Sequence, residues 1–247
     1  MNIARFNGGR IGVVIGDRIH DVSEACGVDP SEWPPMGMIT TIAAFDELRP
    51  GIERDLGLSV GQPLTSVSLE TPIPWPHKVL VAGSDGFFMK SNAALSGPAE
   101  AIVIPELAGR TFHYEGKLAI VVGKTARNVA AADALDYVFG YACLIDVTMR
   151  GEEAPAMRKS FDTFCPVGPW IVTADEGGPS ADAAAVREAI ARCSAVSTLQ
   201  PGDIVAADAR CAAGSIAPGD AVRIAIENVG EMTVSVVAGA PATAQLR

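Results

Sequence analysis

The stretch HYEGKLAIVVGK, His113 to Lys124, decides the fold of this chain. Its second half, LAIVV, is a run of apolar and β-branched residues closed by a glycine, which is typical of a strand buried on both faces. Alternate residues of a strand share a face, so Glu115 and Lys117 lie on the same side of it. Charges beside a packed strand are costly to bury unless they serve each other or a ligand. The sequence therefore marks Glu115 and Lys117 as candidate site residues.

The composition predicts a soluble protein with a substantial core. The chain has 247 residues, of which 49% are apolar and 19% charged, enough for one large β-rich domain or a main domain with a small appendage. The formal net charge of −10 argues against nucleic-acid and anionic membrane partners, because both need clustered Lys and Arg. Five scattered cysteines and the lack of a signal-type or long apolar segment favour a cytoplasmic protein with reduced thiols.

Turn and strand signals divide the chain into two predicted domains. Residues 1–71 begin with a β-meander and continue into a Pro- and Gly-rich region with a short helix, TTIAAFDELRP, that we expect to stop at Pro50. Residues 72–247 begin with a proline-rich linker and are dominated by strand signals. Two helices are expected there, over residues 130–138 and from Ser180 to about Ser197. Each PGD triplet, at 201–203 and 218–220, predicts a turn before a strand.

Two further clusters of polar residues stand at the ends of apolar segments. Asp146, Arg150 and Glu153 follow one predicted strand, in LIDVTMRGEE, and Lys159 and Thr163 precede another, in MRKSFDTFCPVGPWIVT. Charges at strand ends are often solvated, but sites built on a rigid sheet also use them. Composition and spacing alone support a pocket of carboxylates, amines and a guanidinium, which suits a small anionic, oxygen-rich ligand.

These segments resemble the fumarylacetoacetate hydrolase superfamily. The similarity is carried by YEGKLAIVVGK, ALDYVFGYACLIDVTMR, KSFDTFCPVGPWIVT and EAIARCSAVSTLQPGDIV and covers roughly residues 72–237. The resemblance implies a mainly β fold with α/β elements, a rolled β-sandwich with a small N-terminal domain, and a homodimer. It also implies small oxo-acid or dicarbonyl substrates and a Mg²⁺-type cation, held by three carboxylates, that stabilises an enolate.

The resemblance assigns roles to individual residues. Glu115 and Asp146 match the first and third metal ligands, but the second ligand position is Lys117. A protonated lysine cannot bind a hard cation, so we expect no metal cofactor, with Glu115 and Asp146 as vestigial ligand positions. Four further residues match positions in or beside the family pocket: Lys159, Arg150, Thr163 and Glu153, the last where the family usually has Gln. Of these, Arg150, Thr163 and Glu153 are expected to bind the substrate.

Other family elements are missing or changed. A lid with a His and a Glu three residues later, which would activate water, normally follows the strand that matches KVLVAG, but here SDGFFMKSNAALSGP follows it. The hairpin before the last helix is missing, and DARCAAGSIA replaces the Gly- and Thr-rich loop after the first PGD.

Three functions are compatible with this sequence, and the retained pocket residues favour an enzyme. The first is an enzyme that works without a metal on a small oxo acid or dicarbonyl compound, by decarboxylation, isomerisation, cyclisation or C–C cleavage. Its catalytic residues would be Glu115, Lys117, Asp146 and Lys159, with the two ammoniums holding an enolate. The second is a non-catalytic binding module or partner subunit of an active paralogue. The third is an ordinary Mg²⁺-dependent C–C hydrolase.

Overall fold

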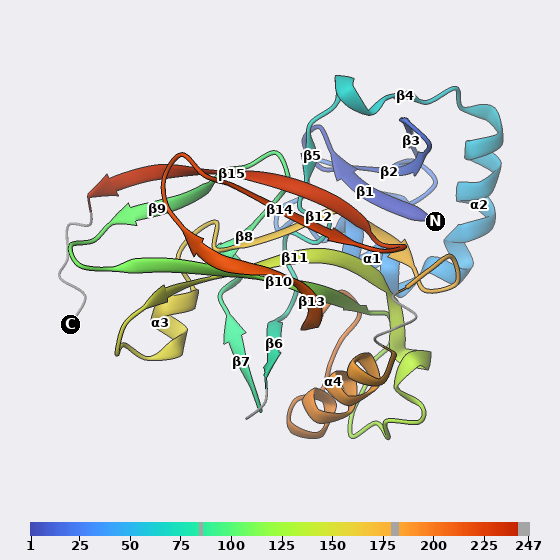
Figure 1. The fold of residues 1–247 in the computed structure, drawn as a ribbon. Helices are drawn as coiled ribbons and strands as arrows, with labels where there is room; N and C mark the ends of the chain where they lie inside the picture. The colour runs from blue at the N-terminus through green and yellow to red at the C-terminus, as the bar shows by residue number, and fades with distance from the viewer. Residues whose placement is uncertain (84–85, 179–182, 242–247) are drawn as a thin grey trace.

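The computed structural model describes residues 1–83, 86–178 and 183–241, and most of them lie in strands (Figure 1). The N-terminal part contains β1 (Asn2–Phe6), β2 (Arg10–Ile15), β3 (Arg18–Asp21), α1 (Gly37–Ala43), α2 (Phe45–Leu58), β4 (Gln62–Pro63), η1 (Leu64–Ser66) and β5 (Leu69–Glu70). The rest contains β6 (Val79–Gly83), β7 (Gly86–Lys90), η2 (Asn92–Ala94), β8 (Leu95–Ser96), β9 (Ile102–Glu106), β10 (Thr111–Val122), η3 (Ala134–Tyr137), β11 (Val138–Arg150), α3 (Pro155–Lys159), β12 (Cys165–Thr173), α4 (Ala183–Val196), β13 (Ile204–Ile216), β14 (Ala221–Ile226) and β15 (Gly230–Pro241).

These strands form two sheets. The larger has the order β4-β3-β2-β1-β12-β11-β10-β13-β6-β7, with β5 added beside β1 and β8 beside β12. The smaller has the order β14-β15-β9 and packs against β11, β12 and β13 of the larger sheet (Figure 1). The predicted mainly β fold is therefore confirmed.

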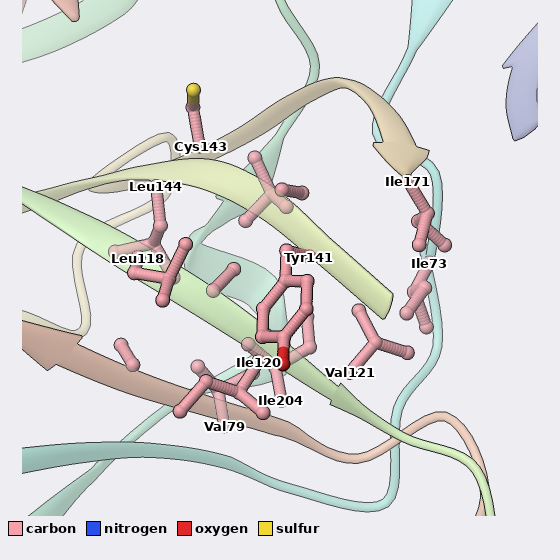
Figure 2. Close-up of a cluster of buried hydrophobic side chains, with 14 of the residues drawn as sticks. Ile73, Val79, Leu118, Ile120, Val121, Tyr141, Cys143, Leu144, Ile171 and Ile204 are labelled. Carbon is pink, nitrogen blue, oxygen red and sulfur yellow. The ribbon is translucent and has the colours of Figure 1, made fainter. Parts of the chain in front are cut away.

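The stretch from His113 to Val122, which belongs to β10, lies in the interior of the larger sheet. β10 pairs with β11 on one side and β13 on the other, both antiparallel. Residues 118–122 of β10 have no exposed surface. Figure 2 shows Leu118, Ile120 and Val121 packed among apolar side chains of β6, β11, β12 and β13. Burial of each such side chain contributes about 1.5–3 kcal/mol, so this strand anchors the core.

The N-terminal strands extend the same sheet. β1 pairs antiparallel with β12, with Asn2 opposite Val172 and Ile3 opposite Ile171. β2 and β3 continue outward from β1, and Ile3, Ile11 and Val13 are buried in the main hydrophobic core. Residues 1–71 are thus joined to the rest of the chain by backbone hydrogen bonds as well as by packing, and the division at residue 71 stays a prediction.

The helix predicted to stop at Pro50 does not stop there. The helical segment is interrupted at Ala44, between α1 and α2, and Pro50 lies inside α2. Proline at this position removes the hydrogen bond to the carbonyl of Asp46, at a cost of about 3 kcal/mol. Phe45 and Ile52 are buried on the core-facing side of α2, and this packing holds the helix on both sides of the proline.

The other helix predictions have mixed outcomes. Residues 130–138 do not form an α-helix; they form turns and the short 3-10 helix η3. A segment this short is not a stable helix without packing, and Ala134 is the buried residue of η3. The later helix is confirmed as α4, with Val186, Ala189, Ile190 and Cys193 buried. Its predicted first residues, 180–182, lie outside the described ranges. None of the helices within those ranges is long and apolar enough to cross a membrane.

Both PGD triplets form turns, as predicted. Gly202 and Gly219 have φ of 83° and 99°, in the left-handed region that favours glycine. The aspartates that follow accept hydrogen bonds from backbone N–H groups three residues earlier: Gln200 N to Asp203 Oδ2 at 2.7 Å and Ala217 N to Asp220 Oδ2 at 2.8 Å. The turns direct the chain into β13 and β14.

Candidate active site

The pairing of β10 with β11 places the two predicted carboxylates together. Glu115 is directly opposite Asp146, and directly opposed side chains of an antiparallel pair lie on the same face. Thr148 lies two residues beyond Asp146 and therefore shares that face. This face of the β10–β11 pair is the floor of the candidate site.

Two lysines converge on Asp146. Lys90 Nζ donates to Asp146 Oδ1 at 2.6 Å and to the carbonyl oxygen of Val147 at 3.0 Å. Lys159 Nζ donates to Asp146 Oδ2 at 2.9 Å and to Thr148 Oγ1 at 2.7 Å. The side chains of Lys90, Asp146 and Lys159 are 0%, 2% and 13% exposed. We call these three residues the lysine–aspartate cluster.

Asp146 and Lys159, two of the predicted site residues, are thus in contact, but Lys90 was missed from the sequence. Lys90 ends β7, which folds back on β6 with Gly86 opposite Gly83 and Lys90 opposite Val79. Only two residues separate these strands, in the region where the family normally has its lid. The available signal was the FFMK pattern, in which a lysine alternates with an aromatic residue directly after an apolar strand.

Burial and charge oppose each other in the cluster. Burial is the largest influence on Asp146 and acts to raise its pKa, but the ammoniums of Lys90 and Lys159 together outweigh it and hold that pKa below its usual value. Burial also lowers the pKa of Lys159, and the Lys90 ammonium adds to this, while the carboxylates of Asp146 and Glu115 act the other way. With two ammoniums and one carboxylate, the cluster carries a net charge of +1.

Lys117 belongs to a second group, at the rim of the site. Its Nζ donates to Glu115 Oε2 at 2.8 Å and forms an ion pair with Asp208. The Lys117 side chain is 7% exposed, whereas Glu115 and Asp208 are 46% and 77% exposed. Burial acts to lower the pKa of Lys117, but its bonds to both carboxylates raise it overall. We call Glu115, Lys117 and Asp208 the rim trio; its net charge is −1.

Asp208 was also missed, because only strand register reveals it. Asp208 is opposite Lys117 on β13, and Ala213 is opposite Glu115, so β13 advances five residues while β10 advances two. This irregularity falls in the segment that replaces the family's Gly- and Thr-rich loop. An exposed aspartate in such a segment gives no sequence signal of a contact with a lysine ninety-one positions away.

For Thr163 and Glu153, two of the three predicted substrate-binding residues, the recorded side-chain partners lie outside the cluster. Thr163, at φ 66°, accepts a hydrogen bond from Val103 N at 2.8 Å and so ties its loop to β9. Glu153 is buried, pairs with Arg110, and has no partner for Oε2 among the described residues. Arg150 is exposed at the end of β11, on the face of Asp146 but about 13 Å along the strand. Only Arg150 shares the floor of the site.

The donor set was tested against the metal site that the family implies. Within the described residues, no group of three or more His, Cys, Asp or Glu side chains is arranged to hold a metal ion. Both carboxylate oxygens of Asp146 already accept from ammoniums, and the Lys117 ammonium lies against Glu115. In this arrangement the residues do not fit a site built from three carboxylates.

Comparisons with known proteins agree with the resemblance. The family profile described as "Fumarylacetoacetate (FAA) hydrolase C-terminal" matches residues 55–187, more than half of the chain. Maleylpyruvate hydrolase of Aquipseudomonas alcaligenes is 33% identical, over 96% of this chain and 99% of the relative. The chain belongs to the fumarylacetoacetate hydrolase family. That alignment spans 285 positions, more than the 247 residues of this chain, so the relative has segments without a counterpart here.

Solved structures extend this likeness to the whole fold. Maleylpyruvate hydrolase from Sphingobium sp. SYK-6, solved in complex with manganese(II) ion and pyruvate, is 46% identical with a TM-score of 0.91, covering 97% of this chain and 100% of that chain. A probable 2-hydroxyhepta-2,4-diene-1,7-dioate isomerase from Mycobacterium abscessus is 25% identical with a TM-score of 0.80, covering 98% and 100%. The rolled β-sandwich expected from the resemblance is confirmed.

These relatives settle two expectations in opposite ways. They are named as hydrolases and isomerases, so the expectation of an enzyme is confirmed at the level of the family. The expectation of no metal cofactor, drawn from Lys117, is contradicted by the manganese(II) ion in the 46%-identical Sphingobium structure. The error was to infer the absence of a cofactor from one ligand position.

Proposed function

We propose that this protein cleaves a C–C bond in a small oxo dicarboxylic acid of the maleylpyruvate type, through an enolate intermediate. The names of the A. alcaligenes and Sphingobium relatives, and the pyruvate in the Sphingobium structure, support this substrate class. The observation that carries the proposal is the lysine–aspartate cluster, which holds a net positive charge in a nearly buried position.

A buried excess of positive charge is costly in the absence of an anion. A substrate carboxylate or enolate oxygen beside Lys90 and Lys159 neutralises that charge. An ammonium has three N–H donors, and among the described residues the N–H groups of Lys90 have two acceptors, Asp146 and the carbonyl of Val147. One N–H group of Lys90 therefore has no acceptor among the described residues, and in this proposal a bound anion supplies it.

In the proposed reaction, Glu115 acts on the water, and Lys90 and Lys159 act on the enolate. Glu115, which Lys117 holds at 2.8 Å, takes a proton from the water that adds to a substrate carbonyl. The C–C bond then breaks and its electron pair passes to the enolate, stabilised by the ammoniums of Lys90 and Lys159. Lys159 gives a proton to the enolate carbon, and the lowered pKa of Lys159 favours this transfer. The proton taken by Glu115 then returns to Lys159 through water, which restores both groups. The sum is substrate plus water giving two acids.

The Sphingobium relative was solved with manganese(II), so assays of this protein should contain Mn²⁺.

The direct test is product analysis by NMR after incubation with maleylpyruvate and Mn²⁺. We expect release of pyruvate, and a loss of rate of about 10²–10³-fold in Lys159→Met and in Lys90→Met. Lys124→Met is the matched control, because Lys124 is exposed and lies outside the cluster. If Lys159→Met cleaves maleylpyruvate as fast as the wild type, the cluster is not the active site.

Isomerisation is a second candidate, favoured by the short β6–β7 connection. The water-activating pair of the family lid has no equivalent there, and moving a double bond needs a proton donor and acceptor but no water. The Mycobacterium abscessus relative is named as an isomerase. Incubation with 2-hydroxyhepta-2,4-diene-1,7-dioate distinguishes the two, since isomerisation leaves the molecular mass of the substrate unchanged.

A further inference from the structure

A threonine with an unusual backbone conformation lies in the turn that follows Lys159. The carbonyl oxygen of Phe161 accepts a hydrogen bond from Phe164 N at 3.1 Å, which closes a four-residue turn with Thr163 at its third position. The φ of Thr163 is 66°, in the left-handed region that a β-branched residue rarely adopts. The other non-glycine residues with positive φ in the described ranges are asparagines, which tolerate this region. The conformation of Thr163 is therefore strained and must be held by its surroundings.

A hydrogen bond to the smaller sheet holds this threonine. Val103 N, on β9, donates to Thr163 Oγ1 at 2.8 Å. β9 is an outer strand of the smaller sheet, and Val103 is paired there with Val237 of β15. A glycine at position 163 would adopt the positive φ without strain, but it would leave the N–H of Val103 without this acceptor. The bond to β9 thus gives a physical reason for a threonine where the turn alone would favour glycine or asparagine.

Both ends of this turn reach the same place on β11. Before the turn, Lys159 contacts Asp146 through its ammonium, at 2.9 Å. After the turn, the carbonyl oxygen of Phe164 accepts from Val147 N at 3.1 Å, one residue from Asp146, and the side chain of Phe164 is fully buried. The chain must therefore reverse within a few residues to make both contacts. The backbone conformation of Thr163 sets the path of this reversal, and its bond to β9 fixes that conformation.

We propose that Thr163 is a positioning residue, which fastens the turn to β9 and thereby keeps Lys159 directed at Asp146 and at the bound substrate. This role differs from the substrate binding expected from the family resemblance. The part of the proposal that concerns catalysis rests on the proposed function. The part that concerns the placement of Lys159 can be measured in the absence of substrate.

The substrate-free experiment is acetylation of the lysines with limiting acetic anhydride, followed by peptide mass spectrometry. Lys78 is the internal reference, because its side chain is 12% exposed and ion-paired, as that of Lys159 is at 13%. Thr163→Val keeps the β-branched shape and removes only the hydroxyl, so the ratio of Lys159 to Lys78 labelling should rise several-fold. Thr163→Ser keeps the hydroxyl and should preserve the wild-type ratio. The control Thr233→Val, at an exposed position of β15, should also preserve it. A wild-type ratio in Thr163→Val overturns the proposal.

A second variant covers the case in which Thr163→Val does not fold. Thr163→Gly removes the same hydroxyl but adopts the positive φ without strain, so it should fold at least as readily as Thr163→Val. Its labelling ratio should still rise, because the turn is no longer fastened to β9. A wild-type ratio in Thr163→Gly would mean that the shape of the turn alone places Lys159, and the proposal would be overturned.

Activity toward maleylpyruvate with Mn²⁺ gives an independent reading. Thr163→Val should lower kcat by at least about 10-fold with KM near the wild-type value, because small misplacements of a catalytic group are costly. Thr163→Ser should restore kcat. A raised KM with unchanged kcat in Thr163→Val would instead indicate that Thr163 binds the substrate, and would refute the positioning role. If the labelling ratios follow the expected pattern but the wild type turns over no oxo acid, the proposed function fails while the placement of Lys159 by Thr163 stands.

Discussion

Asp146→Asn should destabilise this protein far more than removal of either lysine that Asp146 binds. The substitution leaves two ammoniums, 0% and 13% exposed, without their shared carboxylate. Breaking a buried ion pair from one side costs about 3–5 kcal/mol, because the remaining charge stays buried and uncompensated. Lys90→Met instead leaves Asp146 paired with Lys159, and removes one donor to Asp146 Oδ1 and the donor to the carbonyl of Val147, at a cost of about 1–3 kcal/mol.

The assay is urea unfolding at pH 7 of the wild type, both single variants and the Lys90→Met/Asp146→Asn double variant. The double variant contains one unpaired ammonium where Asp146→Asn contains two, so it should be more stable than Asp146→Asn despite the additional substitution. Equal losses in the two single variants, or a double variant weaker than both, would refute the idea that excess positive charge dominates this cluster.

Three further outcomes follow from the structure. The pKa of Asp146 is lower in the folded state than in the unfolded state, where it is about 4. The contribution of Asp146 to stability should therefore be full above about pH 4 and be lost as the pH falls through the lower pKa of the folded state. The urea midpoints of wild type and Asp146→Asn should converge in acid. Lys117→Glu should bind Mn²⁺ at least about 10-fold more tightly than the wild type by calorimetry, since charges at about 4 Å interact by several kcal/mol. The control Lys124→Glu should bind Mn²⁺ no more tightly than the wild type, and equal affinities in Lys117→Glu and wild type would contradict the prediction. We also expect a homodimer, on the family resemblance alone, and light scattering that gives the mass of one chain at micromolar concentration would exclude it.

The sequence predicted those parts of the site that are local. The LAIVV run identified β10, and alternation along it placed Glu115 and Lys117 on one face. Asp146 and Lys159 were both named as site residues because each matches a family position, and the structure places them in contact. A cytoplasmic location and the substrate-binding roles of Arg150 and Glu153 stay predictions.

The parts that were missed depend on pairing between distant segments. Lys90 and Asp208 reach the site through the hairpin of β7 with β6 and the irregular register of β13 with β10. For Lys90 the FFMK pattern gives only a weak local signal, and for Asp208 the sequence gives none. Pro50 failed as a helix stop for a related reason: the core packing of Phe45 and Ile52 outweighs a local preference.

The pairing of β1 with β12 determines how this protein can be shortened. A chain that starts at residue 72, the predicted boundary, would leave the hydrogen-bonding groups of Ile171 and Val172 without their partner strand. It would also uncover apolar surface that Ile3 and Ile11 now protect. An exposed apolar strand edge is a template for self-association. Such a truncated chain should therefore accumulate as aggregate in expression trials, and anyone who needs a minimal catalytic fragment should retain the first fifteen residues, which form β1 and its neighbour β2.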